Sequence, residues 1–129
     1  MITSSRRNVM KGAIALSALG VMPATLHARG PAPAVFIYDA RFDAARELAL
    51  AWQRRGVAIL DPREHDLGLA WREHIPQLLA KGGGIEGATL WSDRFVCEAF
   101  GKEHGLAAQP GEARLPGDAT GSLRHWIVA

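Results

Sequence analysis

The chain has 129 residues, of which 48% are hydrophobic, with 15 basic and 13 acidic side chains. A length of this size predicts one domain, and its single cysteine, Cys97, excludes iron–sulfur clusters and multi-cysteine zinc sites within one chain. All 13 acidic residues follow residue 28, whereas three of the basic residues precede it. The part after residue 28 therefore carries about one net negative charge, and no nucleic-acid partner is predicted because that needs clustered excess Lys and Arg.

The first 28 residues predict an export signal. Two adjacent arginines, Arg6 and Arg7, precede an apolar run at 12–22, and Pro23 ends that run. A membrane-spanning helix needs about 20 apolar residues, so this shorter run predicts a cleavable signal and no stable membrane anchor.

The sequence from Ser5 to Lys11, Ser-Arg-Arg-Asn-Val-Met-Lys, resembles the twin-arginine (Tat) export consensus. The resemblance covers residues 1–28 and implies a bacterial protein that the twin-arginine export machinery carries, already folded, to a periplasmic or secreted location. The general secretory route is the alternative. Ala28 is the preferred last residue of the signal, and Ala24 and Ala34 are the other candidates.

A Pro-rich spacer at 29–34 is followed by a single predicted α/β domain at 35–129. Apolar runs predict buried strands at 35–38, 57–60 and 87–91. Helical spacing of apolar residues predicts helices at 43–55, at 66–81, and from the cap Ser92 to Gly105. Asp43 is the candidate cap of the first helix, and Pro76 is expected to kink or split the second.

The region after Gly105 is less regular. Residues 106–109 are a candidate short strand, residues 110–121 a loop, and residues 123–128 a final strand. This order predicts a small three-layer α/β domain, Rossmann-like or flavodoxin-like in outline, with a mostly parallel sheet of four to five strands. The final strand follows a loop, so it is the candidate for an antiparallel strand at an edge.

Aspartates and arginines follow each of the first three predicted strands, where open α/β sheets bind ligands. The candidate ligand-binding residues are Arg41, Arg63, Ser92, Asp93 and Arg94. The candidate acid–base groups are Asp39, Asp61 and His65. Arginine forks suit carboxylate or phosphate, so the set predicts an anionic small molecule. Helix capping and local ion pairing are the alternative roles for the same residues.

No cofactor and no metal site are predicted. The first strand-to-helix turn contains no glycine, and Gly82–Gly84 joins a helix to a strand, which is the wrong end of the sheet for a phosphate loop. No pair of histidines has the helical metal-site spacing, and His125 in the final strand has no evident partner. Cys97 is expected to be a buried, unreactive thiol.

Three functional interpretations stay open, and the residues do not decide whether the chain is an enzyme. The first is an exported binding or accessory protein that travels with a larger periplasmic enzyme, since a folded partner would explain the twin-arginine route. An exposed tryptophan would then mark the interface, with Trp71 and Trp126 as candidates. The alternative is a small enzyme or ligand-binding domain acting on an anionic small molecule at the strand ends. The third is a fast-folding domain that uses the route because it folds early.

Overall fold

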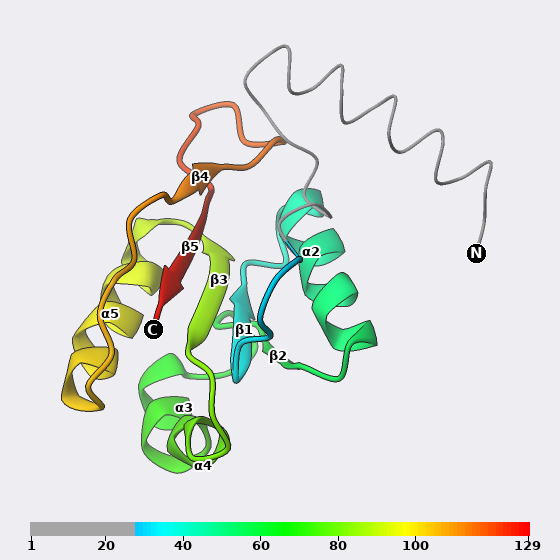
Figure 1. Cartoon of the computed structure of the whole chain (residues 1–129). Helices are drawn as coiled ribbons and strands as arrows, with labels where there is room; N and C mark the ends of the chain where they lie inside the picture. The colour runs from blue at the N-terminus through cyan, green and yellow to red at the C-terminus, as the bar shows by residue number, and fades with distance from the viewer. Residues whose placement is uncertain (1–27) are drawn as a thin grey trace.

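The computed structural model describes residues 28–129, so Arg6, Arg7 and the predicted signal lie outside the described part. A five-stranded sheet has the order β2-β1-β3-β5-β4 (Figure 1). The strands are β1 (Val35–Tyr38), β2 (Ala58–Leu60), β3 (Ile85–Thr89), β4 (Ala113–Arg114) and β5 (Arg124–Val128). The helices are α2 (Asp43–Arg54), α3 (Leu67–Glu73), α4 (Ile75–Leu79) and α5 (Trp91–Glu103). None of these helices is long and apolar enough to cross a membrane.

The sheet is mixed, so the expectation of a mostly parallel sheet is confirmed only for β2, β1 and β3. β1 pairs in parallel with β2 and β3, whereas β5 pairs antiparallel with both β3 and β4. The cause is a hairpin-like return after α5. Residues 106–114 run back along the sheet, and β5 then inserts between that stretch and β3. The final strand is antiparallel, as expected, but it lies inside the sheet instead of at an edge.

The expected strand at 106–109 forms only an isolated bridge, Ala108 with Val128. Backbone bonds extend this irregular contact, because the amides of Ala107 and Gln109 donate to the carbonyls of Ala129 and Ile127 at 3.1 and 2.8 Å. The predicted loop at 110–121 contains the two-residue strand β4. The segment therefore serves as a partial edge strand that covers β5.

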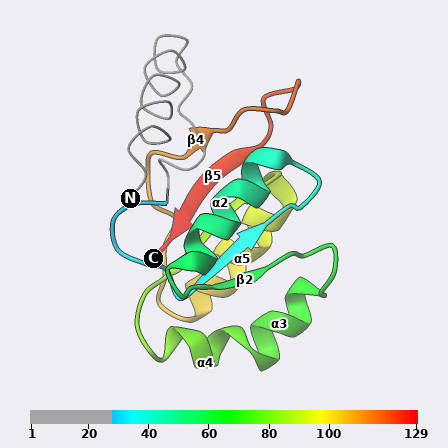
Figure 2. The same cartoon turned by 90° about the vertical axis from the view of Figure 1, so that its right-hand side faces the viewer.

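Helices cover both faces of the sheet, which confirms the α/β class and its layered arrangement (Figure 2). Successive residues of β1 point to opposite faces, as the pleat requires. Phe36 packs with α2, including Leu48 and Trp52. Val35 and Ile37 pack on the other face against the group formed by α3, α4 and α5.

Local chemistry explains most of the element boundaries. Pro76 lies in the first turn of α4 and separates it from α3, which confirms the expected split. The Asp66 carboxylate caps α3 by accepting the Leu69 amide at 2.8 Å. The residue before α2 is Phe42, so Asp43 is not the cap. The strand β2 is only partly buried because it lies at the edge of the sheet.

Candidate functional site

The carboxyl ends of the parallel strands bring three aspartates to one edge of the sheet. Asp39 follows β1 and Asp61 follows β2, and their residues are 0% and 7% exposed. Asp93 lies in the first turn of α5, directly after β3. The helix after β1 packs on one face of the sheet and the helix after β3 on the other. The strand ends of β1 and β3 therefore flank a topological switch point, where open α/β sheets bind ligands.

Arg41 is bound to Asp39 by three side-chain hydrogen bonds, of which the longest joins Nε to Oδ2 at 3.2 Å. Its Nε donates to Oδ1 at 2.9 Å, and its Nη2 donates to Oδ2 at 2.6 Å. The Arg41 amide also donates to Oδ1 at 3.1 Å. Burial raises the pKa of Asp39, but the hydrogen bonds from Arg41 outweigh it, so the pKa lies below its usual value. Arg41 thus neutralises a buried carboxylate of its own loop.

Asp93 has the opposite shift, because burial and repulsion from Asp39 raise its pKa despite the attraction of Arg41 and Arg63. Within residues 28–129 no ion pair to Arg63 is formed, although its amide donates to the Asp61 carboxylate at 2.9 Å. Its side chain is exposed beside the aspartates. Arg63 is therefore the predicted arginine at this edge that an anion can reach without breaking an ion pair with a described residue.

The other predicted residues do not join this group. Arg94 forms ion pairs with Glu98 and Glu112. One residue step turns the helix by about 100°, so Arg94 faces β5 and the segment before β4 when Asp93 faces the strand ends. Ser92 is exposed and makes no cap bond, and His65 is exposed in the loop after β2. The three predicted arginines therefore do not converge.

An exposed aromatic pair lies on the first turns of α5. Trp91 is 62% exposed and Phe95 is 54% exposed, and their ring centroids are 5.1 Å apart in a stacked arrangement. The two tryptophans expected at a surface, Trp71 and Trp126, are each 2% exposed and belong to the core. The apolar run 87–91 predicts Trp91 as the last residue of a buried strand, whereas β3 ends at Thr89 and Trp91 begins α5.

The residues next to this pair are charged. A cavity of about 250 Å³ lies between the start of α5 and the start of β5. Trp91, Arg94, Glu112 and Arg124 are among the residues that line it. Glu112 bridges the two arginines, with its Oε1 3.6 Å from the Arg124 Nε and an ion pair to Arg94. The aromatic pair is thus bordered by a charged network.

A buried Glu86–His125 pair joins β3 to β5. The Glu86 Oε2 is 2.8 Å from the His125 Nε2, and the residues are 5% and 8% exposed. The expectation that His125 lacks a partner is therefore wrong. The register pairs Glu86 with Ile127 and Ala88 with His125, so the two side chains are diagonal neighbours on one face. Such a pair, 39 residues apart, is visible only once the register of β3 and β5 is known.

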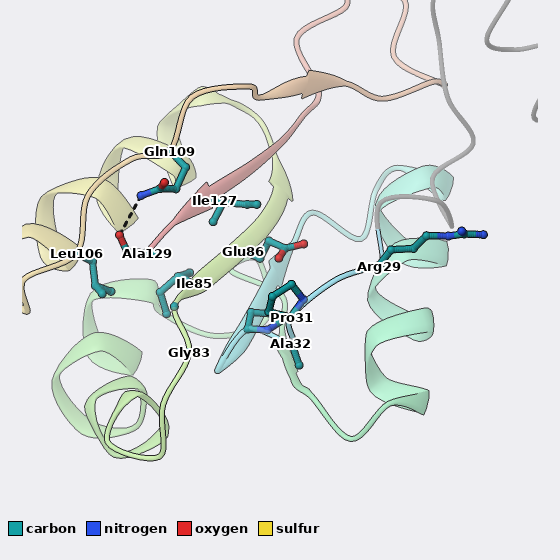
Figure 3. A pocket seen from close by; sticks show the side chains of 12 residues that line it. Arg29, Pro31, Ala32, Gly83, Ile85, Glu86, Leu106, Gln109, Ile127 and Ala129 are labelled. Atoms are coloured by element: carbon teal, nitrogen blue, oxygen red, sulfur yellow. Dashed lines mark hydrogen bonds between the residues drawn. The ribbon is translucent and has the colours of Figure 1, made fainter.

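Glu86 also lines a larger cleft, of about 650 Å³, at the amino ends of β1 and β3 (Figure 3). One wall is the segment 29–33, and the other includes Gly83, Leu106, Ile127 and Ala129. This cleft is larger than the cavity beside Trp91, but its walls are mainly apolar or backbone. None of Asp39, Asp61 and Arg63 lines either cavity.

Cys97 is buried in the core beside α3, and burial raises the pKa of its thiol to about 12. The thiol is protonated at neutral pH, which agrees with the expected unreactive role. Among residues 28–129, no group of three or more His, Cys, Asp and Glu side chains is placed to hold a metal ion. Compared with protein families, with curated proteins and with solved structures, the chain matches none of them.

Proposed function

We propose that this chain is a periplasmic accessory protein, exported by the twin-arginine route, that docks onto a larger folded partner through Trp91 and Phe95. The exposed aromatic pair carries this proposal. Large aromatic side chains contribute most to the energy of protein interfaces, and a stacked pair on a helix presents them with little loss of conformational freedom. The Tat resemblance of Ser5–Lys11 supports it, since that route accepts proteins already assembled with a partner.

The charged network around Glu112 suggests the chemistry of the partner. Arg94 and Arg124 share the Glu112 carboxylate, and Arg94 also pairs with Glu98, so the aromatic rings are bordered by two arginines and two carboxylates. A partner with an apolar pocket for the rings and side chains of both charges at its border would match it. Interfaces of this design bury the aromatic anchors at the centre and leave the ion pairs at the rim.

Native mass spectrometry of the protein recovered from its own periplasm tests the docking proposal. The wild-type chain is expected to carry one larger protein in fixed stoichiometry. The double variant Trp91→Ala/Phe95→Ala is expected to lose it, and Leu50→Ala, which alters a 48% exposed side chain on α2, is expected to keep it. A bare monomer in every sample, or a partner retained by the double variant, would contradict the proposal. A homodimer lost by the double variant would replace the partner with a second copy of the chain.

The export route has its own test. Replacing Arg6 and Arg7 together by lysine keeps the charge but removes the paired guanidinium groups of the Tat-like motif. We expect the precursor to accumulate in the cytoplasm, with at least a tenfold loss of periplasmic protein on immunoblots. Arg72→Lys, a surface substitution on α3, is the control. Unchanged export of the double-lysine variant would favour the general secretory route.

A second candidate function is the binding of a small anion at the carboxyl edge. The exposed side chain of Arg63 favours it, since it forms no ion pair with a described residue. The parallel order β2-β1-β3 is the one in which flavodoxin-like sheets place a ligand between the first and third strands. Calorimetric titration with inorganic pyrophosphate tests this function. Binding that Arg63→Ala weakens at least tenfold, and that Arg72→Ala leaves intact, would support it. No detectable heat, or equal binding by both variants, would argue against it.

A further inference from the structure

We infer that the signal is removed on the N-terminal side of Arg29, so that residues 29–34 stay as a packed part of the mature domain. This inference rests on the proposed export and narrows its processing site. The sequence offers three alanines as the last residue of the signal. In the structure, the peptide bonds after Ala28 and after Ala34 have different surroundings.

The bond between Ala34 and Val35 lies inside the sheet. The Ala34 amide donates to the Gly84 carbonyl at 2.7 Å, which extends the pairing of β1 with β3 by one residue. Val35 is 1% exposed and pairs with Ala58 on one side and Ile85 on the other. A peptidase needs an extended, accessible backbone on both sides of the bond it cuts, and proteolysis concentrates where backbone is exposed and unpaired. Cleavage after Ala34 would require the central strand to leave the sheet.

The residues just before Ala34 are also packed against the domain. Pro33 is buried, and the backbone of 32–34 lies directly over Gly83. A Cβ at Gly83 would be 2.9 Å from the Ala34 nitrogen and 3.1 Å from the Ala32 oxygen, too close for any side chain. Glycine at this position therefore allows a close approach between the glycine-rich loop and the segment after the signal.

Arg55 holds the beginning of the segment. Its guanidinium lies 4.5 Å from the centroid of the Trp52 ring. From there Nη1 donates to the Ala28 carbonyl and Nη2 to the Gly30 carbonyl, both at 3.1 Å. The segment is thus fixed at both ends, by Arg55 at residues 28–30 and by the sheet at residue 34.

In the proposed route the domain folds before the signal is cut, so the packing of residues 29–34 decides which bonds the peptidase can reach. The Tat resemblance implies that the domain is folded before it crosses the membrane, so the peptidase meets the segment already packed. Arg29 and Gly30 are exposed, whereas Pro33 and Val35 are buried. Of the two candidate bonds within residues 28–129, the one between Ala28 and Arg29 is therefore the more accessible. Arg29 would remain in the mature chain as a residue that lines the cleft beside Glu86.

The test is the N-terminal sequence and intact mass of the full chain, carrying a C-terminal tag, recovered from the periplasm. We expect a first residue at or before Arg29. A mature chain that begins at Val35 would overturn the inference. If only unprocessed precursor in the cytoplasm is found, the proposed export fails, and the packing is then judged by a second measurement.

The second measurement is limited proteolysis of the purified full chain by elastase, which cuts after small residues. We expect cuts before Arg29 and protection of the Ala34–Val35 bond. Arg55→Ala should raise the rate of cutting within 28–34 several-fold, and Arg54→Ala, the neighbouring exposed arginine of α2, should not. Rapid cutting after Ala34 in the wild-type chain, or no difference between the two variants, would overturn the inference.

Discussion

Asp39 and Asp93 lie at the same edge of the sheet, yet their carboxyl groups respond to the fold in opposite directions. Arg41 lowers the pKa of Asp39, so the charged form is favoured in the folded state. Burial and the neighbouring aspartates raise the pKa of Asp93, so its charged form is disfavoured there. Replacing each aspartate by asparagine can therefore distinguish Asp39, whose charge the fold favours, from Asp93, whose charge the fold disfavours.

We expect Asp39→Asn to lower stability at pH 7 by about 1.5–3 kcal/mol, the usual value of a hydrogen bond to a charged group. A lowered pKa gives stability that is present above the ordinary value of 3.8 and lost as the pH falls through the folded-state pKa. The difference in unfolding free energy between wild type and Asp39→Asn should therefore become smaller as the pH is lowered. Urea unfolding between pH 3 and pH 7 measures it, with Glu47→Gln as the exposed control. A deficit that does not change with pH would contradict this assignment.

Asp93→Asn should instead raise stability at pH 7. A raised pKa gives stability that is present below the unfolded-state value of 3.8 and lost as the pH rises through the folded-state pKa. At neutral pH the amide avoids that loss. The gain should vanish near pH 3, and the same urea series measures it. A variant less stable than wild type at pH 7 would show that the carboxylate makes a favourable contact.

Gly87 is required by contact with one side chain. A Cβ there would lie 2.2 Å from an indole carbon of Trp126, which covers this position of β3 from the neighbouring strand. We expect Gly87→Ala to destabilise the protein by about 1–3 kcal/mol or more, the cost of overpacking a core. Gly105→Ala is the comparison, because open space surrounds its Cβ and only its positive φ of 78° opposes the change. Chemical unfolding of both variants measures the difference, and equal losses would contradict the contact argument.

At the scale of elements, α2 and α3 both have an aspartate near their start, but only the aspartate of α3 caps its helix. Asp66 accepts the Leu69 amide, whereas Asp43 lies inside α2 and makes no cap bond. Asp66→Ala should cost about 0.5–2 kcal/mol, the range measured for losing an N-cap. Asp43→Ala should cost less, since it removes only an exposed ion pair with Arg46 and a favourable charge near the helix start. Thermal unfolding followed by circular dichroism measures both losses of stability. A larger loss for Asp43→Ala than for Asp66→Ala would contradict this prediction.

Elements that depend on local pattern could be predicted from the sequence. The apolar run Val35–Tyr38 is a strand with the predicted bounds, and Pro76 divides the second helical stretch as its chemistry requires. The position of β5 could not be predicted, because its neighbours are decided by how residues 106–114 return along the sheet. The same non-local register brings His125 to Glu86.

The candidate site was also predictable only in part: the sequence predicted where its aspartates lie but not where its arginines point. Strand ends predicted that Asp39, Asp61 and Asp93 would gather at one edge, and the fold brings them together. The direction of each arginine depends on its own surroundings: Arg41 binds the nearest aspartate, and Arg94 faces Glu112 on another segment. The exposure of Trp91 follows from β3 ending at Thr89, two residues before the predicted end.

At the scale of the whole molecule, one sheet joins two apolar cores. Leu48 lies in the core under α2, and Ile75 lies in the core on the opposite face, each 0% exposed. Leu48→Ala and Ile75→Ala should each cost about 2–5 kcal/mol. Because the strands are shared, both variants should still unfold in one transition, with tryptophan fluorescence and far-ultraviolet circular dichroism coincident. Two separated transitions in either variant would show that the faces fold independently.

The inner position of β5 has a consequence for the order of assembly during synthesis. β5 is the last strand of the sheet along the chain, yet it pairs with β3 on one side and β4 on the other. Until residues up to 128 have left the ribosome, β3 presents a row of unpaired amides and carbonyls, the kind of edge that recruits other chains. The sheet can close only after the whole domain has been released. A nascent chain of this protein is therefore exposed to pairing with other chains at the β3 edge until β5 has been released.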